Sequence, residues 1–376
     1  MMNKKRRKKV LFVCSSVFQL YVAITIKIIF FQDRCVDLVL TDSTPVFRQL
    51  YLNKKLISLF NNVKFVEVGK NIGKLNRLQR SKYGQCFYEI FPKKYVKKVW
   101  EIDVKDYQEL FFSSYIKQNV LIQYAIKKSC KKNKVNVFED GISTYLLKNM
   151  QKSYVPPFIK KLFKIKEVEK CVDNVYMFEP NLMCVGGYKN IIKIPNPTTN
   201  KEVITVLSEI FEDNGYKIKE KFIFLEESFN NDGYTTNDVE LIHNLYDYCE
   251  RKNFILKHHP RNRLDRFKTV LPTMEKNIFW ENYLLKNSLD DKVLVAVSSN
   301  TVFVPHIILN EQKPTIILLY KIFKGTSPIL GSENFEKYVE KYYKLYSDYT
   351  KDKMFIPQTI QEYEEIIRKL AMEEND

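Results

Sequence analysis

Hydrophobic residues along this chain fall into short runs that alternate with longer segments of helical periodicity. Val10–Cys14 and Val36–Thr41 are two such runs, and the helical segment Phe18–Phe30 lies between them. Strands that alternate with helices in this way form βαβ units and a mostly parallel sheet. The pattern predicts further strands at Val63–Val68, Leu110–Ser113, Val135–Phe138, Lys221–Leu225, Phe254–Lys257, Ile278–Trp280, Val293–Val297 and Thr315–Leu319.

The other hydrophobic segments repeat with the 3.6-residue period of a helix. Residues 71–98 are basic without a clear period, and residues 153–199 form a looser stretch with five prolines. The 376 residues are too many for one ordinary core, so we expect two α/β domains, residues 1–205 and residues 206–376. The further helices predicted are Pro45–Phe60, Ile116–Lys131, Asn237–Arg251, Val302–Leu309, Glu333–Tyr349 and Gln361–Ala371.

Composition indicates a folded chain with reduced thiols. Apolar residues make up 45% of the chain and charged residues 28%, which argues against global disorder. The seven cysteines are scattered and include no CxxC pair. We therefore expect a cytoplasmic location and neither a disulfide framework nor a zinc site.

The net charge of +17 favours anionic partners: nucleic acid, lipid surfaces or acidic ligands. The Lys-, Asn-, Ile- and Tyr-rich usage of an AT-rich genome explains the same charge equally well. Because the charge is spread and no nucleic-acid motif is present, nucleic acid is not an expected partner.

The N-terminus resembles a signal peptide or membrane anchor, since basic residues 3–9 precede an uncharged run from Val10 to Ile26. The run is short for a spanning helix and is interrupted by Ser15, Ser16 and Gln19. We favour a strand, a polar turn and a helix. The basic cluster Lys4–Lys9 remains available for peripheral contact with anionic lipid.

Glu139, Asp140 and Gly141 directly follow a buried strand, where an open α/β sheet binds its ligands. Gly141 permits a tight turn. A carboxylate there can act as general base on a sugar hydroxyl. An acidic pair at this position serves equally as a helix cap, so both interpretations stay open.

His259 follows another strand and precedes Pro260, which holds it extended. Lys257, His258 and Arg261 surround it in sequence. A protonated imidazole here can bind a phosphate and donate a proton to it. A surface turn in a basic protein would contain the same residues.

Ser298, Ser299 and Asn300 lie between a predicted strand and a predicted helix. Hydroxyls and free backbone N–H groups at such a turn can bind phosphate. An ordinary helix N-cap uses the same residue types. Glu226 ends another strand and is a further candidate for contact with a ligand.

Several metal and phosphate motifs are missing from the sequence. There is no Walker-type loop, GxGxxG, HExxH or Asp-x-Asp. We therefore expect neither a metal nor a cofactor, and a departing phosphate would be neutralised by histidine and backbone donors.

The acidic pair with glycine, the His-Pro pair and the paired serines resemble, in this order, the motifs of bacterial sialyltransferases. The opening VLFVCSSVFQLYVAI is similar to the start of the lipooligosaccharide sialyltransferases of glycosyltransferase family 52. The resemblance spans Val10 to about Thr301 as short islands. It implies the GT-B fold: two Rossmann-like domains with mostly parallel sheets that face a central cleft.

The resemblance also implies an inverting, metal-independent transfer from CMP-sialic acid to a galactoside or other terminal sugar of a capsule or lipooligosaccharide. The family pattern has Asp-Asp where this chain has Glu-Asp, so either Asp140 or Glu139 is the base. The other implied roles are His259 as the acid at the phosphate, Ser298 and Ser299 as phosphate ligands, and Ser15, Ser16 and Gln19 as cleft residues.

Two alternatives remain. Family 52 also contains transferases that use other nucleotide sugars, and a basic membrane-associated or nucleic-acid-binding protein would be a non-enzyme. The expected partners are a nucleotide-sugar donor and a glycan acceptor. A second copy of the chain is left open.

Overall fold

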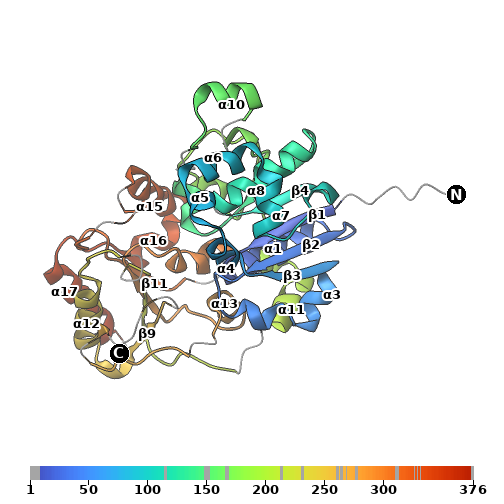
Figure 1. The fold of residues 1–376 in the computed structure, drawn as a ribbon. Coiled ribbons are helices and arrows are strands. Elements are labelled where there is room, and N and C mark those ends of the chain that lie inside the picture. The colour runs from blue at the N-terminus through green and yellow to red at the C-terminus, as the bar shows by residue number, and fades with distance from the viewer. Residues whose placement is uncertain are drawn as a thin grey trace.

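The strands of this protein form two parallel sheets, each flanked by helices (Figure 1). The first, of seven strands, has the order β3-β2-β1-β4-β5-β6-β7, and the second, of five, the order β12-β11-β10-β8-β9. The computed structural model describes residues 9–113, 117–147, 153–165, 169–211, 215–229, 233–259, 262, 266–267, 269–275, 278–309, 313–325, 327, 329–330 and 332–373.

The strands match the hydrophobic runs closely. In the first sheet they are β1 Lys9–Cys14, β2 Val36–Thr41, β3 Asn62–Val66, β4 Tyr107–Phe112, β5 Lys134–Phe138, β6 Asn174–Met177 and β7 Ile191–Lys193. In the second they are β8 Phe222–Leu225, β9 Phe254–Lys257, β10 Val293–Ala296, β11 Thr315–Leu318 and β12 Met354–Phe355.

Helices connect the strands, and they include the segments predicted from the periodicity together with others that were not predicted. They are α1 Val17–Phe30, α2 Phe47–Leu50, α3 Lys54–Leu59, α4 Val68–Gly73, α5 Arg77–Arg80, α6 Lys82–Ile90, α7 Pro92–Val99, α8 Lys117–Ser129, α9 Ile142–Leu146, α10 Pro157–Phe163, α11 Lys201–Ile210, α12 Asp238–Tyr248, α13 Trp280–Lys286, α14 Val304–Leu309, α15 Glu333–Leu345, α16 Ser347–Lys353 and α17 Ile360–Met372.

Four expectations need correction. The predicted helix Pro45–Phe60 is two short helices, because the Asn53 side chain caps a new start at α3. The predicted strand Ile278–Trp280 is wrong, since α13 begins at Trp280. The unassigned residues 71–98 are largely helical, and the stretch 153–199 supplies β6 and β7.

The uncharged N-terminal run lies inside the core of the first domain, as the strand–turn–helix interpretation predicts. It divides into β1 and α1, and the Ser16 hydroxyl caps the helix by accepting a hydrogen bond from the Gln19 amide at 3.2 Å. Both elements are almost wholly buried. Within the part of the chain that the structure describes, no helix is long and apolar enough to span a bilayer.

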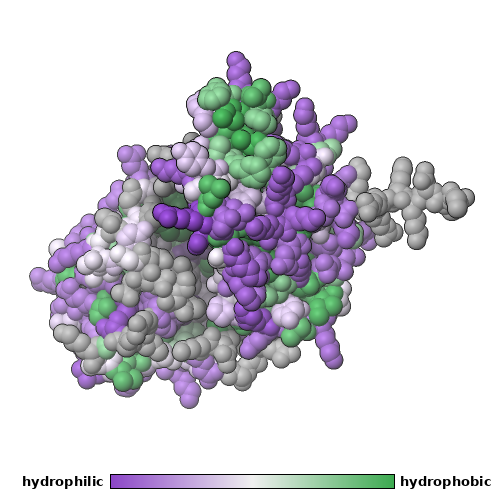
Figure 2. Space-filling view, viewed as in Figure 1, coloured by the Kyte–Doolittle hydropathy of each residue, from purple (hydrophilic) through white to green (hydrophobic). Residues whose placement is uncertain are grey.

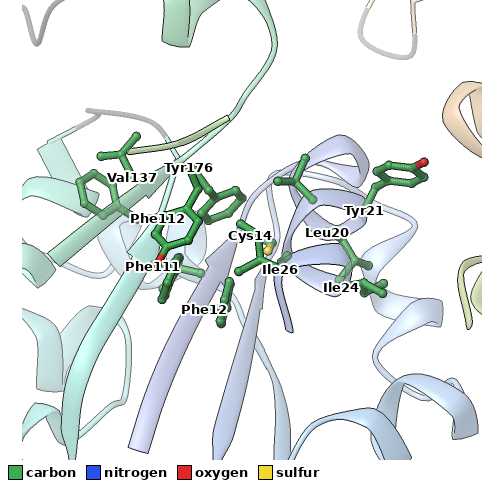
Figure 3. Packing of buried hydrophobic residues seen from close by; sticks show 14 of the residues in the cluster. Phe12, Cys14, Leu20, Tyr21, Ile24, Ile26, Phe111, Phe112, Val137 and Tyr176 are labelled. Atoms are coloured by element: carbon green, nitrogen blue, oxygen red, sulfur yellow. The ribbon is translucent and has the colours of Figure 1, made fainter. Parts of the chain in front are cut away.

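Stacked aromatic residues pack the first sheet. Phe12 of β1 lies against Phe111 of β4 with ring centroids 4.3 Å apart, and Tyr176 of β6 continues the row (Figure 3). Each fully buried ring of this size contributes roughly 1.5–3 kcal/mol. Tyr21 of α1 points away from this row, and its hydroxyl faces the second domain, near Glu281.

The two sheets meet across a boundary where the turns after their strands come together. A side chain at Gly141, after β5, would lie 3.2 Å from the Asn300 amide nitrogen, after β10. The Asn334 amide also donates to the Leu146 carbonyl at 2.9 Å. This is the expected GT-B arrangement. The expected boundary between residues 205 and 206 falls inside α11, which packs against α1.

Candidate active site

The predicted site residues lie where a parallel sheet binds ligands. Strand order reverses beside β1 in the first sheet and beside β8 in the second. The carboxyl ends of strands at such reversals border a crevice. Ser15 and Ser16 follow β1, Glu226 follows β8, and Ser298 is the second residue after β10.

Asp140 is held by neutral groups at the end of β5. Its side chain is half-buried and accepts a hydrogen bond from Gln19. The Gln19 Oε1 accepts from the Ser15 amide at 2.6 Å, so its NH₂ group is the one available to Asp140. Burial raises the pKa of the Asp140 carboxyl above its usual value, which strengthens it as a base.

Glu139 has a different environment from its neighbour. It is 1% exposed, and its Oε2 accepts from the Tyr145 hydroxyl at 2.6 Å and the Phe178 amide at 2.8 Å. Burial raises its pKa to about 7, although these hydrogen bonds lower it. Glu139 therefore joins β5 to α9 and to the segment after β6, and its oxygens face the protein interior.

Gly141 completes the turn with φ of +66°, a conformation that favours glycine. Behind it, the Asp140 amide donates to the Thr144 hydroxyl at 2.8 Å, and the Ser143 hydroxyl donates to the Asp140 carbonyl at 3.0 Å. These bonds fix the Asp140 backbone against the start of α9.

Glu226 organises the end of β9. Its Oε2 accepts from the His259 amide at 2.7 Å and lies 2.7 Å from His258 Nδ1, while Arg266 contacts its Oε1. Burial alone would raise the pKa of Glu226, but the bonds from His258 and His259 and the charge of Arg266 hold it below the usual value. Its carboxylate thus positions the backbone of the His259 turn.

Ser298 is tied to Glu227. The Ser298 hydroxyl donates to Glu227 Oε1 at 2.5 Å and its amide to Oε2 at 3.1 Å. Burial raises the pKa of Glu227 to about 7. The Ser299 hydroxyl accepts from the Thr301 amide at 3.3 Å and so caps the turn Asn300–Val302. Helix capping is thus part of the role of this motif.

Two half-buried opposite charges, Lys257 and Glu281, lie nearby. Burial lowers the pKa of Lys257, while Glu281 of α13 partly restores it. The Lys257 ammonium is 5.9 Å from the centre of the Trp280 ring. Burial likewise raises the pKa of Glu281. Glu281 also acts on the Tyr21 hydroxyl across the domain boundary, where its charge helps to raise the pKa of that tyrosine.

A cavity of about 200 Å³ opens beside the Ser15 turn. Both polar and apolar side chains line it, and it lies at the carboxyl ends of β1 and β2. The residues that line it are Ser15, Thr41, Asp42, Ser43, Val68, Gly69, Ile72 and Trp100.

The structure therefore brings Gln19, Asp140, Gly141 and Asn300 to one boundary. Glu226, Lys257, His259 and Ser298 gather at the second sheet. Pro260 and Arg261 lie outside the described residues. Among the residues that the structure describes, no group of three or more His, Cys, Asp or Glu side chains could hold a metal ion.

Sequence reasoning missed Arg266 and Glu281. Neither gave a signal, since each acts on a residue far from it in sequence. Glu227 was a weak candidate together with Glu226, because it follows a strand beside Glu226 as Asp140 follows Glu139.

Comparison with known proteins gives one family match. Residues 10–320 match the alpha-2,8-polysialyltransferase family. No curated protein sequence matches the chain.

Solved structures resemble it at the level of overall shape. They include MurG from Acinetobacter baumannii (9% identity, 98% of this chain and 91% of that one, TM-score 0.47). A UDP-glucosyltransferase from Polygonum tinctorium gives 10% identity, 97% and 93% coverage and a TM-score of 0.48. A UDP-GlcNAc 2-epimerase from Neisseria meningitidis has 11% identity, covers 96% of this chain and 94% of its own, and gives a TM-score of 0.44.

Proposed function

This chain belongs to the alpha-2,8-polysialyltransferase family, and from that premise we propose that it transfers sialic acid from CMP-sialic acid to a terminal sugar hydroxyl of a bacterial surface glycan. The membership confirms the expected relationship to bacterial sialyltransferases. The chain is therefore a glycosyltransferase, and the non-enzyme alternative falls away.

The unequal environments of Glu139 and Asp140 carry the mechanistic proposal. A general base must present at least one oxygen to the acceptor hydroxyl, whereas the Glu139 side chain is 1% exposed and its Oε2 already accepts two hydrogen bonds. Asp140 is half-buried, has a raised pKa and has Gln19 as its partner. We assign Asp140 as the general base and Glu139 as its structural support.

The acceptor side of the proposal uses the cavity beside Ser15. Ser15 links that cavity to Gln19 and so to Asp140. A sugar whose ring occupies the cavity, near the polar groups of Thr41 and Ser43, would direct a hydroxyl toward the base.

The donor side uses the second sheet. The bond from the anomeric carbon to the phosphate oxygen breaks as the acceptor oxygen attacks the opposite face, and the acceptor proton passes to Asp140. Negative charge then develops on the phosphate of CMP. His259, on a turn that Glu226 positions, would donate to that phosphate. Single displacement inverts the anomeric centre.

We further propose that the reaction needs no metal and that the protein acts in the cytoplasm, in peripheral contact with the inner face of the membrane. The lack of an Asp-x-Asp motif and the basic N-terminal residues support these two points.

Incubation with CMP-sialic acid and a panel of galactosides, followed by mass spectrometry, tests the reaction. Sialylated product should form equally in EDTA and in added magnesium. Product from a UDP-sugar and none from CMP-sialic acid would show that the donor is a different nucleotide sugar. Loss of activity in EDTA that added metal restores would contradict metal independence.

A further inference from the structure

Helix α10 projects from the first domain and carries large apolar side chains in the open (Figures 1 and 2). Phe158 is 72% exposed and Leu162 is 73% exposed. They are four residues apart and so share one face of the helix. Phe163 is exposed on the same short element.

The exposed face continues onto the neighbouring helices. The Phe163 ring lies 6.3 Å from Phe91, which precedes α7, and Phe91 lies 5.0 Å from Phe87 of α6. Both are among the exposed large apolar residues. We call the set Phe87, Phe91, Phe158, Leu162 and Phe163 the α10 surface.

A buried carboxylate fixes this surface to the domain. Glu89 of α6 is 1% exposed and accepts hydrogen bonds from the Ser153 hydroxyl and, at 3.0 Å, from the Tyr154 amide. A helix of seven residues is not stable by itself. The attachment to Glu89 therefore helps to hold α10 in its projecting position.

Positive charge surrounds the α10 surface. Residues 74–100 contain eight Lys or Arg and a single acid, the buried Glu89, and residues 153–165 contain three lysines and no acid. Lys94 lies 5.2 Å from the Phe87 ring centre and 5.5 Å from that of Phe91. Apolar side chains ringed by lysine match the interface of an anionic bilayer.

We propose that the α10 surface docks on an anionic lipid bilayer, with Phe158 and Leu162 inserted among the headgroups and the lysines on lipid phosphates. Exposed Leu162 and the insertion of Phe158 distinguish this from a surface for a soluble polyanion, which would be bound chiefly by the lysines. This contact is separate from the N-terminal basic cluster and does not depend on the transfer reaction.

Co-sedimentation of the full-length protein with lipid vesicles tests the proposal. The parent should bind vesicles that contain phosphatidylglycerol and not vesicles of phosphatidylcholine alone. The double variant Phe158→Ser/Leu162→Ser should bind the anionic vesicles roughly tenfold more weakly. A Lys160→Gln/Lys161→Gln/Lys164→Gln variant should weaken binding by roughly tenfold or more.

Matched controls exist on the second domain. Val270→Ser/Met372→Ser replaces two apolar residues that are also highly exposed, and Lys217→Gln/Lys351→Gln/Lys369→Gln removes three exposed lysines. Both should bind like the parent. Circular dichroism and transfer to a soluble galactoside should be unchanged in the Phe158/Leu162 variant, which separates lost docking from lost folding.

Parent-like vesicle binding by the Phe158/Leu162 variant would overturn the proposal. An equal loss of vesicle binding in the two control variants would also overturn it. So would an absence of vesicle binding together with heparin binding that the Phe158/Leu162 substitutions leave unchanged. A fall in oligomer size by light scattering without a change in vesicle binding would assign the surface to a second copy of the chain.

Discussion

Strands β5 and β8 are followed by the same sequence pattern, two acidic residues, but the two pairs of acids have different environments. Each buried strand is followed by two acids, Glu139-Asp140 in one sheet and Glu226-Glu227 in the other. In each pair the first acid is buried and the second is half-buried. The partners of the first acids differ: the neutral Tyr145 hydroxyl donates to Glu139, whereas Arg266 and His258 contact Glu226.

This difference shows that partners brought by distant segments determine the role of a carboxylate. Arg266 and His258 keep Glu226 ionised and hold the His259 turn. After β5, the first acid, Glu139, holds neighbouring elements together, and the second acid, Asp140, faces the boundary between the domains. Five experiments can break or sharpen this comparison.

Replacement of Asp140 should have the largest effect. Asp140→Asn removes the proposed proton acceptor and should lower kcat roughly 10²- to 10⁴-fold. Product formation from CMP-sialic acid and a galactoside measures it. Thermal unfolding should be close to that of the parent, and near-normal turnover would move the role of base to another residue.

Glu226→Gln should mainly cost stability. It leaves the largely buried Arg266 with Asp238 as its remaining partner, so we expect a loss of about 2–3 kcal/mol in urea unfolding, below the cost of an unpaired buried charge. Glu364→Gln breaks the exposed pair with Arg368 and should cost no more than about 0.5 kcal/mol. Equal losses in both variants would contradict the scaffold role.

Glu139→Gln should change how stability depends on pH. The folded pKa of about 7 exceeds the ordinary 4.5, so the native state binds more protons in that interval and stability falls as pH rises through it. The glutamine variant lacks this fall. Its free energy of unfolding should therefore rise by on the order of 2 kcal/mol relative to that of the parent between about pH 5 and pH 8. Urea unfolding across pH measures this. The exposed Glu365→Gln should follow the parent, and a profile for Glu139→Gln parallel to the parent would show that Glu139 does not titrate in this range.

His259→Ala should weaken the binding of CMP by about 1.5–3 kcal/mol, because it removes a proposed charge-assisted donor to phosphate. Calorimetric titration with CMP measures this without knowledge of the acceptor. The urea midpoint of the variant should equal that of the parent, because the hydrogen bond to Glu226 comes from the backbone of residue 259 and is retained in alanine. Unchanged CMP affinity would make His259 a turn residue.

The serines should give the smallest effect. Ser299→Ala should weaken CMP binding by about 0.5–1.5 kcal/mol. Ser298→Ala should instead show its loss in stability, because its hydroxyl is bound to Glu227. Combined with His259→Ala, Ser299→Ala should be non-additive if both contact one phosphate, and strict additivity would separate them.

The sequence predicted the sheets well because buried parallel strands appear as uninterrupted hydrophobic runs. Val36–Thr41 and Phe254–Lys257 are confirmed at both ends. Strands β6, β7 and β12 were missed, and the last two are so short, at three and two residues, that they carry no period. The same limit explains the error at Ile278–Trp280.

The candidate site was predictable as far as strand ends reveal it. Position after a strand selects Asp140, His259 and Ser298, and topology confirms that they lie at the carboxyl edges of their sheets. Which acid is buried could not be predicted, because Tyr145 and the Phe178 amide reach Glu139 from other elements. The roles themselves stay predictions.

The contact at Gly141 gives a single methyl group a way to disturb the fit between the domains. A methyl group there would lie 3.2 Å from the Asn300 amide nitrogen and would sit on a backbone with φ of +66°. Gly141→Ala would therefore strain its own turn and displace the Asn300 side chain by a few tenths of an ångström, so that the second domain registers a change made in the first. Scattering profiles of this variant and the parent would report whether so small a change shifts one domain against the other.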